Sequence, residues 1–164
     1  MTVTVYMMLG LPGSGKTTLS AQLSSQLGVS KFSLDDEYFS RVPNVQQEQR
    51  DFAIEREIAE SIKERVAALI REGESAVLDF CPWRRHQREE YYRFIKEHGA
   101  VPLVYYLPVE RDELLRRLEV RNALKSAAYQ FMTAAMLSEF YDRFDPPTED
   151  ENVRVIQPAA ILIK

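Results

Sequence analysis

Apolar runs and amphipathic stretches alternate along the chain in a regular order. Residues 3–9 are almost wholly apolar, as in a strand buried in the middle of a sheet. Residues from about 16 to 27 place leucines at helical spacing, and Gly28 is suited to end that helix. The alternation continues, and we expect further strands at 29–34, 77–79, 101–107 and 153–156, and helices at 45–72, 84–98, 112–122 and 133–144.

Strands that alternate with helices favour crossover connections, and therefore a mainly parallel sheet covered on both faces. In such sheets ligands bind at the carboxyl ends of the strands. Gly10, Asp35, Asp79 and Leu107 all come at or just after the end of an expected strand, so their loops should converge. A chain of 164 residues predicts one domain, spanning residues 1–164.

The loop after the first strand matches the pattern G-x-x-x-x-G-K-[ST] at every fixed position. Its residues, with one that follows, are Gly10, Leu11, Pro12, Gly13, Ser14, Gly15, Lys16, Thr17 and Thr18. Glycines let successive N–H groups point into one concavity, and the helix that follows adds a partial positive charge. Lys16 would reach the β- and γ-phosphates, and the Thr17 hydroxyl would ligate Mg²⁺. The sequence therefore predicts a three-layer α/β/α P-loop NTPase fold with a mainly parallel five-stranded sheet. It also predicts that the protein binds ATP and Mg²⁺ at this loop.

Carboxylates follow the second and third expected strands. Transfer of a phosphoryl group to a hydroxyl needs a carboxylate that orients and deprotonates it. We expect Asp35 to be this base, with Asp36 as the second candidate and a substrate contact. For either residue, a helix N-cap followed by a solvated acidic turn is the alternative. Asp79 ends an apolar run as in a Walker B element, and would hold Mg²⁺ or a substrate hydroxyl unless it only closes a turn.

Two groups of arginines are further candidates. Arg84 and Arg88 lie in the first turns of an expected helix, where cations oppose the helix dipole. We predict that they bind substrate, with solvated surface charge as the alternative. Arg117 and Arg121 are four residues apart and share a helix face. We predict that they clamp the phosphates during transfer, the alternative being a salt-bridged face with neighbouring glutamates.

Composition restricts the partners. The formal charge of −4 argues against a general nucleic-acid coat, and a single cysteine, Cys81, excludes an internal disulfide. No apolar run approaches the ~20 residues of a membrane span. The chain enters a strand directly, without the pattern of a targeting peptide. We therefore expect a cytoplasmic protein without a membrane partner, present as a monomer or weak homodimer.

Several segments, taken together and in this order, carry a family resemblance. They are the loop at 10–17, Ser33-Leu34-Asp35-Asp36, Val77-Leu78-Asp79-Phe80, residues 114–122 and residues 144–151. In these the chain resembles the small P-loop kinases that include the polynucleotide kinase domain, chloramphenicol phosphotransferase, gluconate kinase and zeta-toxin-type enzymes. It is especially similar to their stand-alone bacterial AAA-type ATP-binding members.

This resemblance implies an ATP:alcohol phosphotransferase with Asp35 as the base. It also implies that Arg117 and Arg121 belong to a lid, at about 111–133, which closes over the phosphates, and that Asn122 lies by the adenine. The part of the lid after Asn122 is short and carries a single charge, less than a dedicated kinase lid supplies.

We expect the acceptor to be a small molecule with a hydroxyl group rather than the 5′-hydroxyl end of a nucleic acid. The reason is that the chain is acidic and has no long basic stripe. One alternative is a P-loop NTP hydrolase or nucleotide-gated module that acts on a protein partner. Another is a nucleotide-binding protein without catalysis.

Overall fold

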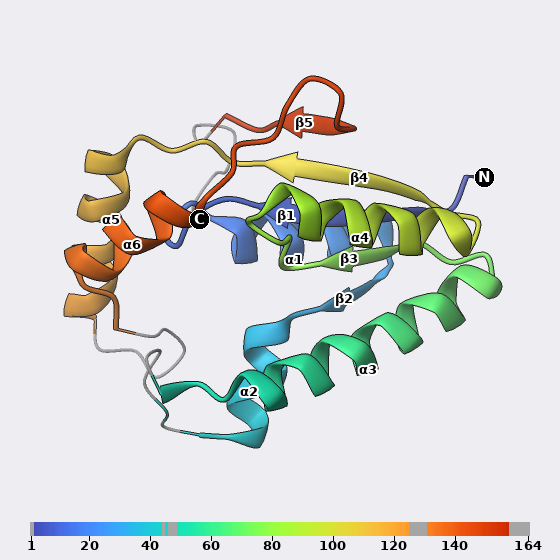
Figure 1. The fold of residues 1–164 in the computed structure, drawn as a ribbon, viewed down its shortest axis with the longest axis horizontal. Helices are drawn as coiled ribbons and strands as arrows, with labels where there is room; N and C mark the ends of the chain where they lie inside the picture. Colours follow the sequence, from blue (N-terminus) through green and yellow to red (C-terminus); the bar gives the residue numbers. More distant parts are fainter. Residues whose placement is uncertain (1, 44, 46–48, 125–130, 158–164) are drawn as a thin grey trace.

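The computed structural model describes residues 2–43, 45, 49–124 and 131–157. Within these residues the strands are β1 (Thr4–Leu9), β2 (Ser30–Phe32), β3 (Ala76–Leu78), β4 (Val101–Tyr106) and β5 (Val153–Val155). The helices are α1 (Lys16–Leu27), α2 (Leu34–Arg41), α3 (Phe52–Arg71), α4 (Arg85–Glu97), α5 (Arg111–Ala123) and α6 (Ala134–Arg143). Strands and helices alternate along most of this order (Figure 1).

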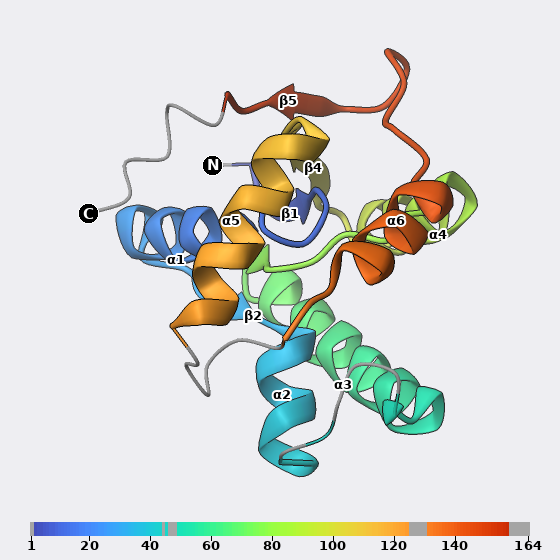
Figure 2. The ribbon, with the colours of Figure 1, turned by 90° about the vertical axis from the view of Figure 1, so that its left-hand side faces the viewer.

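The strands form one parallel sheet in the order β2-β3-β1-β4-β5. The central strand β1 pairs Val5 with Ala76 of β3 on one side and Met7 with Val104 of β4 on the other. Helix α1 covers one face of the sheet and α3 and α4 cover the other, which gives the three layers visible in Figure 2. The predicted fold class is confirmed.

Two apolar clusters hold these layers together. The larger one lies between the sheet and the α3–α4 layer, and it includes the fully buried side chains of Val5, Met7, Ile58 and Ile95. The smaller one joins α5 and α6 to the loop after β1 through Leu11, Leu114, Leu118, Met132 and Leu137. The second cluster therefore fixes α5 directly against the loop that was predicted to bind phosphate.

The start of one helix and the end of one strand differ from the sequence expectation. Helix α3 begins at Phe52, not at residue 45, because the Asp51 side chain accepts a hydrogen bond from the Ala53 N–H (2.8 Å) and caps the helix there. Phe52, the first residue of the helix, is 81 % exposed and so does not belong to the apolar face that packs on the sheet. Strand β2 ends at Phe32, since Ser33 caps α2 by accepting from the Asp36 N–H (3.2 Å).

The described helices include none with the length and apolar character that crossing a bilayer would require. Residues 125–130 of the predicted lid lie outside the described part of the chain.

Candidate functional site

The loop after β1 has the backbone geometry that its glycines allow. Gly13 and Gly15 adopt φ values of 86° and 99°, in the region that favours glycine. The Ser14 N–H donates to the Leu11 carbonyl (3.1 Å), which closes a tight turn. At Gly10 a Cβ atom would lie 2.6 Å from Ser14 Oγ, so a side chain there would disturb the loop. Helix α1 starts at Lys16 with no side-chain cap, and its first N–H groups therefore face an anion site.

Lys16 lies at the centre of the site. Its Nζ donates to the carbonyl oxygens of Gly10 (2.8 Å) and Leu11 (3.1 Å). Burial lowers the pKa of this ammonium from 10.5 to about 8, while Asp79 and Asp35 act to raise that pKa and Arg121 lowers it further. Three of the predicted site residues, from three different segments, are therefore close enough to act on one ammonium group.

Asp79 directly follows β3, with its side chain only 2 % exposed. Burial raises the pKa of this carboxyl group, and the Lys31 ammonium at 3.8 Å and the hydroxyls of Thr17 and Ser20 oppose that effect. The Oδ1 atom is buried and has no hydrogen-bond partner. A buried carboxylate oxygen without a partner, beside a threonine hydroxyl, is a pair of hard oxygen ligands.

These residues fit Mg²⁺ bound together with nucleotide phosphates. The described residues contain no group of three or more His, Cys, Asp or Glu side chains that could hold a metal ion. Mg²⁺ is commonly held by one or two protein oxygens and completed by phosphates and water, and Thr17 and Asp79 would supply the protein share. The uncapped start of α1 and the glycine loop would hold the phosphates themselves.

Asp35 forms an ion pair that the sequence did not predict. It lies in the first turn of α2, and its Oδ1 accepts a hydrogen bond from Arg50 Nη1 at 2.7 Å. The Arg50 Nε atom lies 2.6 Å from Glu55 Oε1, and its guanidinium carbon is 4.4 Å from the centre of the Tyr38 ring. Burial raises the pKa of Glu55, and Arg50 opposes this effect. Arg50 belongs to no motif and is 15 residues from Asp35, so no sequence signal identified it.

Asp36 is also part of the site but has a different partner. Its carboxylate lies 3.6 Å from the Lys31 ammonium, which is shared with Asp79. Because the sequence predicts that a hydroxyl acceptor binds beside Asp35, we call the group Lys31, Asp35, Asp36, Arg50 and Glu55 the acceptor side. The nucleotide side is the loop at residues 10–18 with Arg117 and Arg121. Asp79 lies between the two sides.

The two predicted lid arginines lie at the loop. Arg117 Nη1 donates to the Gly13 carbonyl (3.4 Å), and its Nε donates to Glu113 (2.6 Å). The salt-bridged face and the position at the loop, which the sequence left as alternatives, thus occur together. Arg121 is close enough to Lys16 to lower its pKa. Asn122 binds the backbone of Met132 through both its amide nitrogen (2.7 Å) and its oxygen (3.2 Å), and so joins the end of α5 to the segment before α6.

Of the two arginines predicted to bind substrate at the start of α4, Arg88 requires a correction, while the role of Arg84 stays a prediction. Arg88 is fully buried, and its guanidinium donates to Glu151 (2.7 Å) and to the carbonyl oxygens of Trp83 and Asp145. It was predicted to bind substrate, but it is inaccessible and ties the C-terminal segment to α4. Arg84 Nη1 lies 3.4 Å from Asp145, whose carboxylate also accepts from the backbone N–H of Arg85. The chain's own acids therefore explain cations at this helix start.

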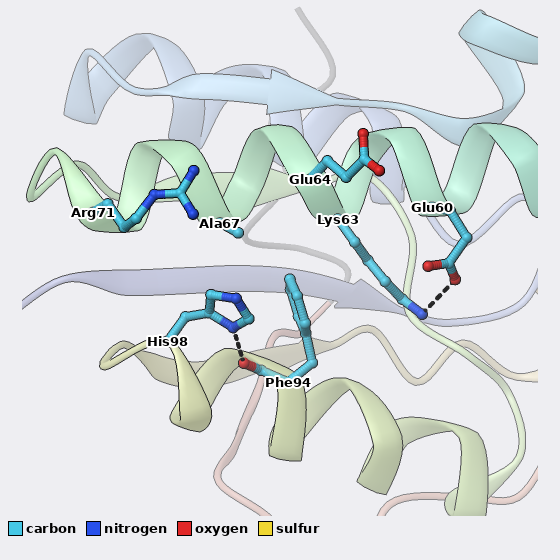
Figure 3. Close-up of a pocket in the computed structure, with 7 residues that line it drawn as sticks. All are labelled: Glu60, Lys63, Glu64, Ala67, Arg71, Phe94 and His98. Atoms are coloured by element: carbon cyan, nitrogen blue, oxygen red, sulfur yellow. Dashed lines mark hydrogen bonds and ion pairs between the residues drawn. The ribbon is translucent and has the colours of Figure 1, made fainter.

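A shallow groove with a volume of about 400 Å³ lies between α3 and α4 (Figure 3). It is lined by Glu60, Lys63, Glu64, Ala67, Arg71, Phe94 and His98. Its residues from α4 are at the end of that helix, which precedes β4, and so the groove lies away from the carboxyl ends of the strands. It contains none of the predicted site residues.

Comparison with known proteins gives a family. The sequence pattern of an AAA domain family matches residues 5–147. No curated protein matches the chain significantly.

Solved structures share the fold. A kinase candidate from Chloroflexus aurantiacus j-10-fl has a TM-score of 0.75 at 19% identity, over 96% of this chain and 89% of that one. A sugar kinase from Janibacter sp. HTCC2649 has a TM-score of 0.70 at 20% identity, over 99% and 91%. A chain in the structure of the Pnkp1/Rnl/Hen1 RNA repair complex has a TM-score of 0.73 at 14% identity, over 87% and 44%. At these identities the likeness is one of fold.

Proposed function

Because the chain belongs to this AAA domain family, as its resemblance to AAA-type ATP-binding proteins predicted, we propose that it moves the γ-phosphate of ATP to a hydroxyl group of an acceptor. The observation that carries this proposal is that the start of α2 and the end of β3 converge beside the loop. Asp36 and Asp79 share the Lys31 ammonium, at 3.6 and 3.8 Å, and Asp35 and Asp79 both raise the pKa of Lys16. A phosphate-binding lysine, a candidate metal ligand and an accessible carboxylate are the groups that this reaction requires.

Each group has a distinct task in the proposed reaction. The loop N–H groups bind the phosphates, and Lys16 exchanges its two carbonyl partners for the β- and γ-phosphate oxygens. Bound Mg²⁺, held by Thr17 and Asp79, would neutralise phosphate charge. Asp35 accepts the proton of the acceptor hydroxyl while the oxygen of that hydroxyl forms a bond to the γ-phosphorus. The bond between that phosphorus and the bridging oxygen breaks, and ADP leaves with the electron pair.

The lid residues complete the nucleotide side. Arg117 and Arg121 would stabilise the negative charge that spreads over the transferred phosphoryl oxygens, since both lie at the loop. Asn122 remains our candidate for a residue near the adenine. Its hydrogen bonds to Met132 mean that it would act by fixing the end of α5 to the segment before α6 as well as by contact.

We propose a small-molecule acceptor in preference to a nucleic-acid 5′ end. The acidic composition supports this choice, because strand binding depends on cations that neutralise phosphates. The alternative function is NTP hydrolysis coupled to a protein partner, and it differs in requiring no hydroxyl acceptor.

The test is ATP consumption with Mg²⁺, with and without a panel of nucleosides, sugars, amino sugars, sugar acids, antibiotics and 5′-hydroxyl oligonucleotides. We expect one class to stimulate ADP formation and to appear as a phosphorylated product by mass spectrometry. The Lys16→Ala variant serves as the control for contaminating kinases. A steady rate of ATP hydrolysis that no acceptor changes would instead favour an NTPase that acts on a protein partner.

A further inference from the structure

The charges around Asp35 restrict the chemistry of the acceptor. We infer that the acceptor is an uncharged or positively charged hydroxyl compound, and that compounds with a phosphate or carboxylate beside the hydroxyl are rejected. This inference rests on the proposed phosphotransfer, and it concerns the acceptor side alone. The evidence for it is the difference in solvent exposure between the negative and the positive side chains on that side.

The exposed charges of the acceptor side are negative. The side chains of Asp35 and Asp36 are 67 % and 71 % exposed. The cations that pair with them are far less accessible, because Lys31 is 25 % exposed and Arg50 is 6 % exposed. An incoming molecule therefore meets carboxylate oxygens first, with the positive groups beneath them.

Each of these cations also contacts two carboxylates. Arg50 lies 2.7 Å from Asp35 and 2.6 Å from Glu55, and its guanidinium rests on the Tyr38 ring. Lys31 lies 3.6 Å from Asp36 and 3.8 Å from Asp79. If Mg²⁺ were to take Asp79, the Lys31 ammonium would still have Asp36 beside it. An anionic acceptor would have to compete with the protein's own carboxylates for either cation.

The three arginines at the start of α4 are each paired with one of the chain's own acids. Arg88 is buried in its ion pair with Glu151, Arg85 pairs with Asp150, and Arg84 lies beside Asp145. The nucleotide side has the opposite character, with Lys16, Arg117 and Arg121 at the loop. Negative charge on a substrate is therefore accommodated where the nucleotide phosphates bind, and opposed where the acceptor binds.

A protonated amine on the acceptor should gain from the exposed carboxylates. Opposite charges within a few ångströms attract, and a surface of one sign raises the encounter rate with a ligand of the other sign. Both effects weaken as salt screens the charges. These two properties, a preference by sign and its loss at high salt, distinguish charge recognition from recognition by shape.

The experiment compares acceptors that share a scaffold and differ in charge. For each scaffold, such as hexose, pentose and cyclitol, the neutral alcohol is tested beside its amino derivative and its carboxylic acid at pH 7. We expect kcat/KM in the order amine, neutral, acid, with at least about tenfold between amine and acid at low salt. This ratio should shrink several-fold at 0.5 M NaCl.

A pair of variants assigns the effect to the acceptor side. Asp36→Asn should reduce the amine-to-acid ratio at least threefold, because it removes an exposed charge without touching the proposed base. Glu97→Gln removes the same charge from the exposed end of α4 and should leave the ratio unchanged. An unchanged ratio in Asp36→Asn would overturn the assignment.

The outcomes separate the two proposals. If acids are the best acceptors, the inference about charge is wrong and the phosphotransferase proposal stands. If no acceptor of the wider panel, including every derivative of these scaffolds, is phosphorylated while ATP still binds, the phosphotransferase proposal is itself overturned, and the inference falls with it.

Discussion

The nucleotide side of the site is almost continuous in sequence, whereas the acceptor side is assembled from separate segments. Residues 10–18 form one strand-to-helix turn, and Arg117 and Arg121 come from a single helix that packs on it. On the acceptor side, Lys31 comes from β2, Asp35 and Asp36 from α2, Arg50 from the segment before α3 and Glu55 from α3. A local motif identifies the first kind of site but not the second.

The two sides also differ in how their charges are satisfied. Among the described residues, Lys16 donates to two backbone carbonyls, and burial keeps its pKa low, so a phosphate is a better partner than those carbonyls. Arg50 instead has two carboxylate partners within 2.7 Å. The nucleotide side is thus prepared to receive negative charge, while the acceptor side is already charge-paired. From this difference we expect that substitutions on the nucleotide side alter ATP binding and that substitutions on the acceptor side do not.

The largest effect is expected from Lys16→Ala. Transfer should fall by about 10³-fold or more, because a donor to the phosphates in the transition state is lost, and ATP affinity should also weaken. Lys96→Ala, which changes an exposed lysine of α4, is the matched control and should behave as the wild type. Phosphoryl transfer and ATP titration measure the two quantities. Retained transfer in Lys16→Ala would refute the assignment of the loop.

Asp35→Asn should reduce kcat by about 10²–10⁴-fold, the range for loss of a general base. ATP affinity should stay within about twofold of the wild-type value, because the change lies on the acceptor side. Asp36→Asn is the matched substitution at the neighbouring residue and should reduce kcat far less. If Asp36→Asn causes the larger loss, then Asp36 is the base.

Arg50→Met tests whether the ion pair positions Asp35. We expect kcat to fall by about 10–100-fold, since a displaced catalytic group loses its alignment with the hydroxyl, while the ATP dissociation constant is unchanged. Arg50→Lys should recover part of kcat, because it keeps the charge. The recovery should be incomplete, because an ammonium cannot hold Asp35 and Glu55 with one planar group. Melting temperatures of both variants separate positioning from loss of the packing on Tyr38. A wild-type kcat in Arg50→Met would show that the pair is dispensable.

The smallest expected effect is a pH dependence of ATP binding. The Lys16 pKa of about 8 in the free protein means that the ammonium loses its proton between pH 7 and 9. Bound phosphates favour the protonated form, so the pKa rises on binding and affinity must fall as pH increases through 8. We expect about tenfold weaker binding of a non-hydrolysable ATP analogue at pH 9 than at pH 7. Lys16→Ala should bind more weakly and show a flat profile, and a flat wild-type profile would contradict the prediction.

The sequence alone determined the parallel α/β fold and the glycine turn between β1 and α1, for which it also predicts phosphate binding. Both depend on local rules, because apolar periodicity specifies strands and helices and a glycine pattern specifies a turn that faces an anion. The convergence of Gly10, Asp35 and Asp79 also followed, since the carboxyl ends of parallel strands lie at one edge. The start of α3 could not be placed from periodicity, because the helix begins only after its Asp51 cap, seven residues beyond the start that the apolar spacing suggested.

Only the tertiary structure decided which charges pair. Arg88 looked like a substrate ligand until folding placed Glu151, 63 residues away, against it. Arg50 had no recognisable role until it appeared beside Asp35. Ion pairs between distant segments depend on where the backbone places each side chain and on how far burial removes it from water, and residue spacing encodes neither. The nucleotide side could therefore be predicted from the sequence, while the partners that distinguish the acceptor side could not.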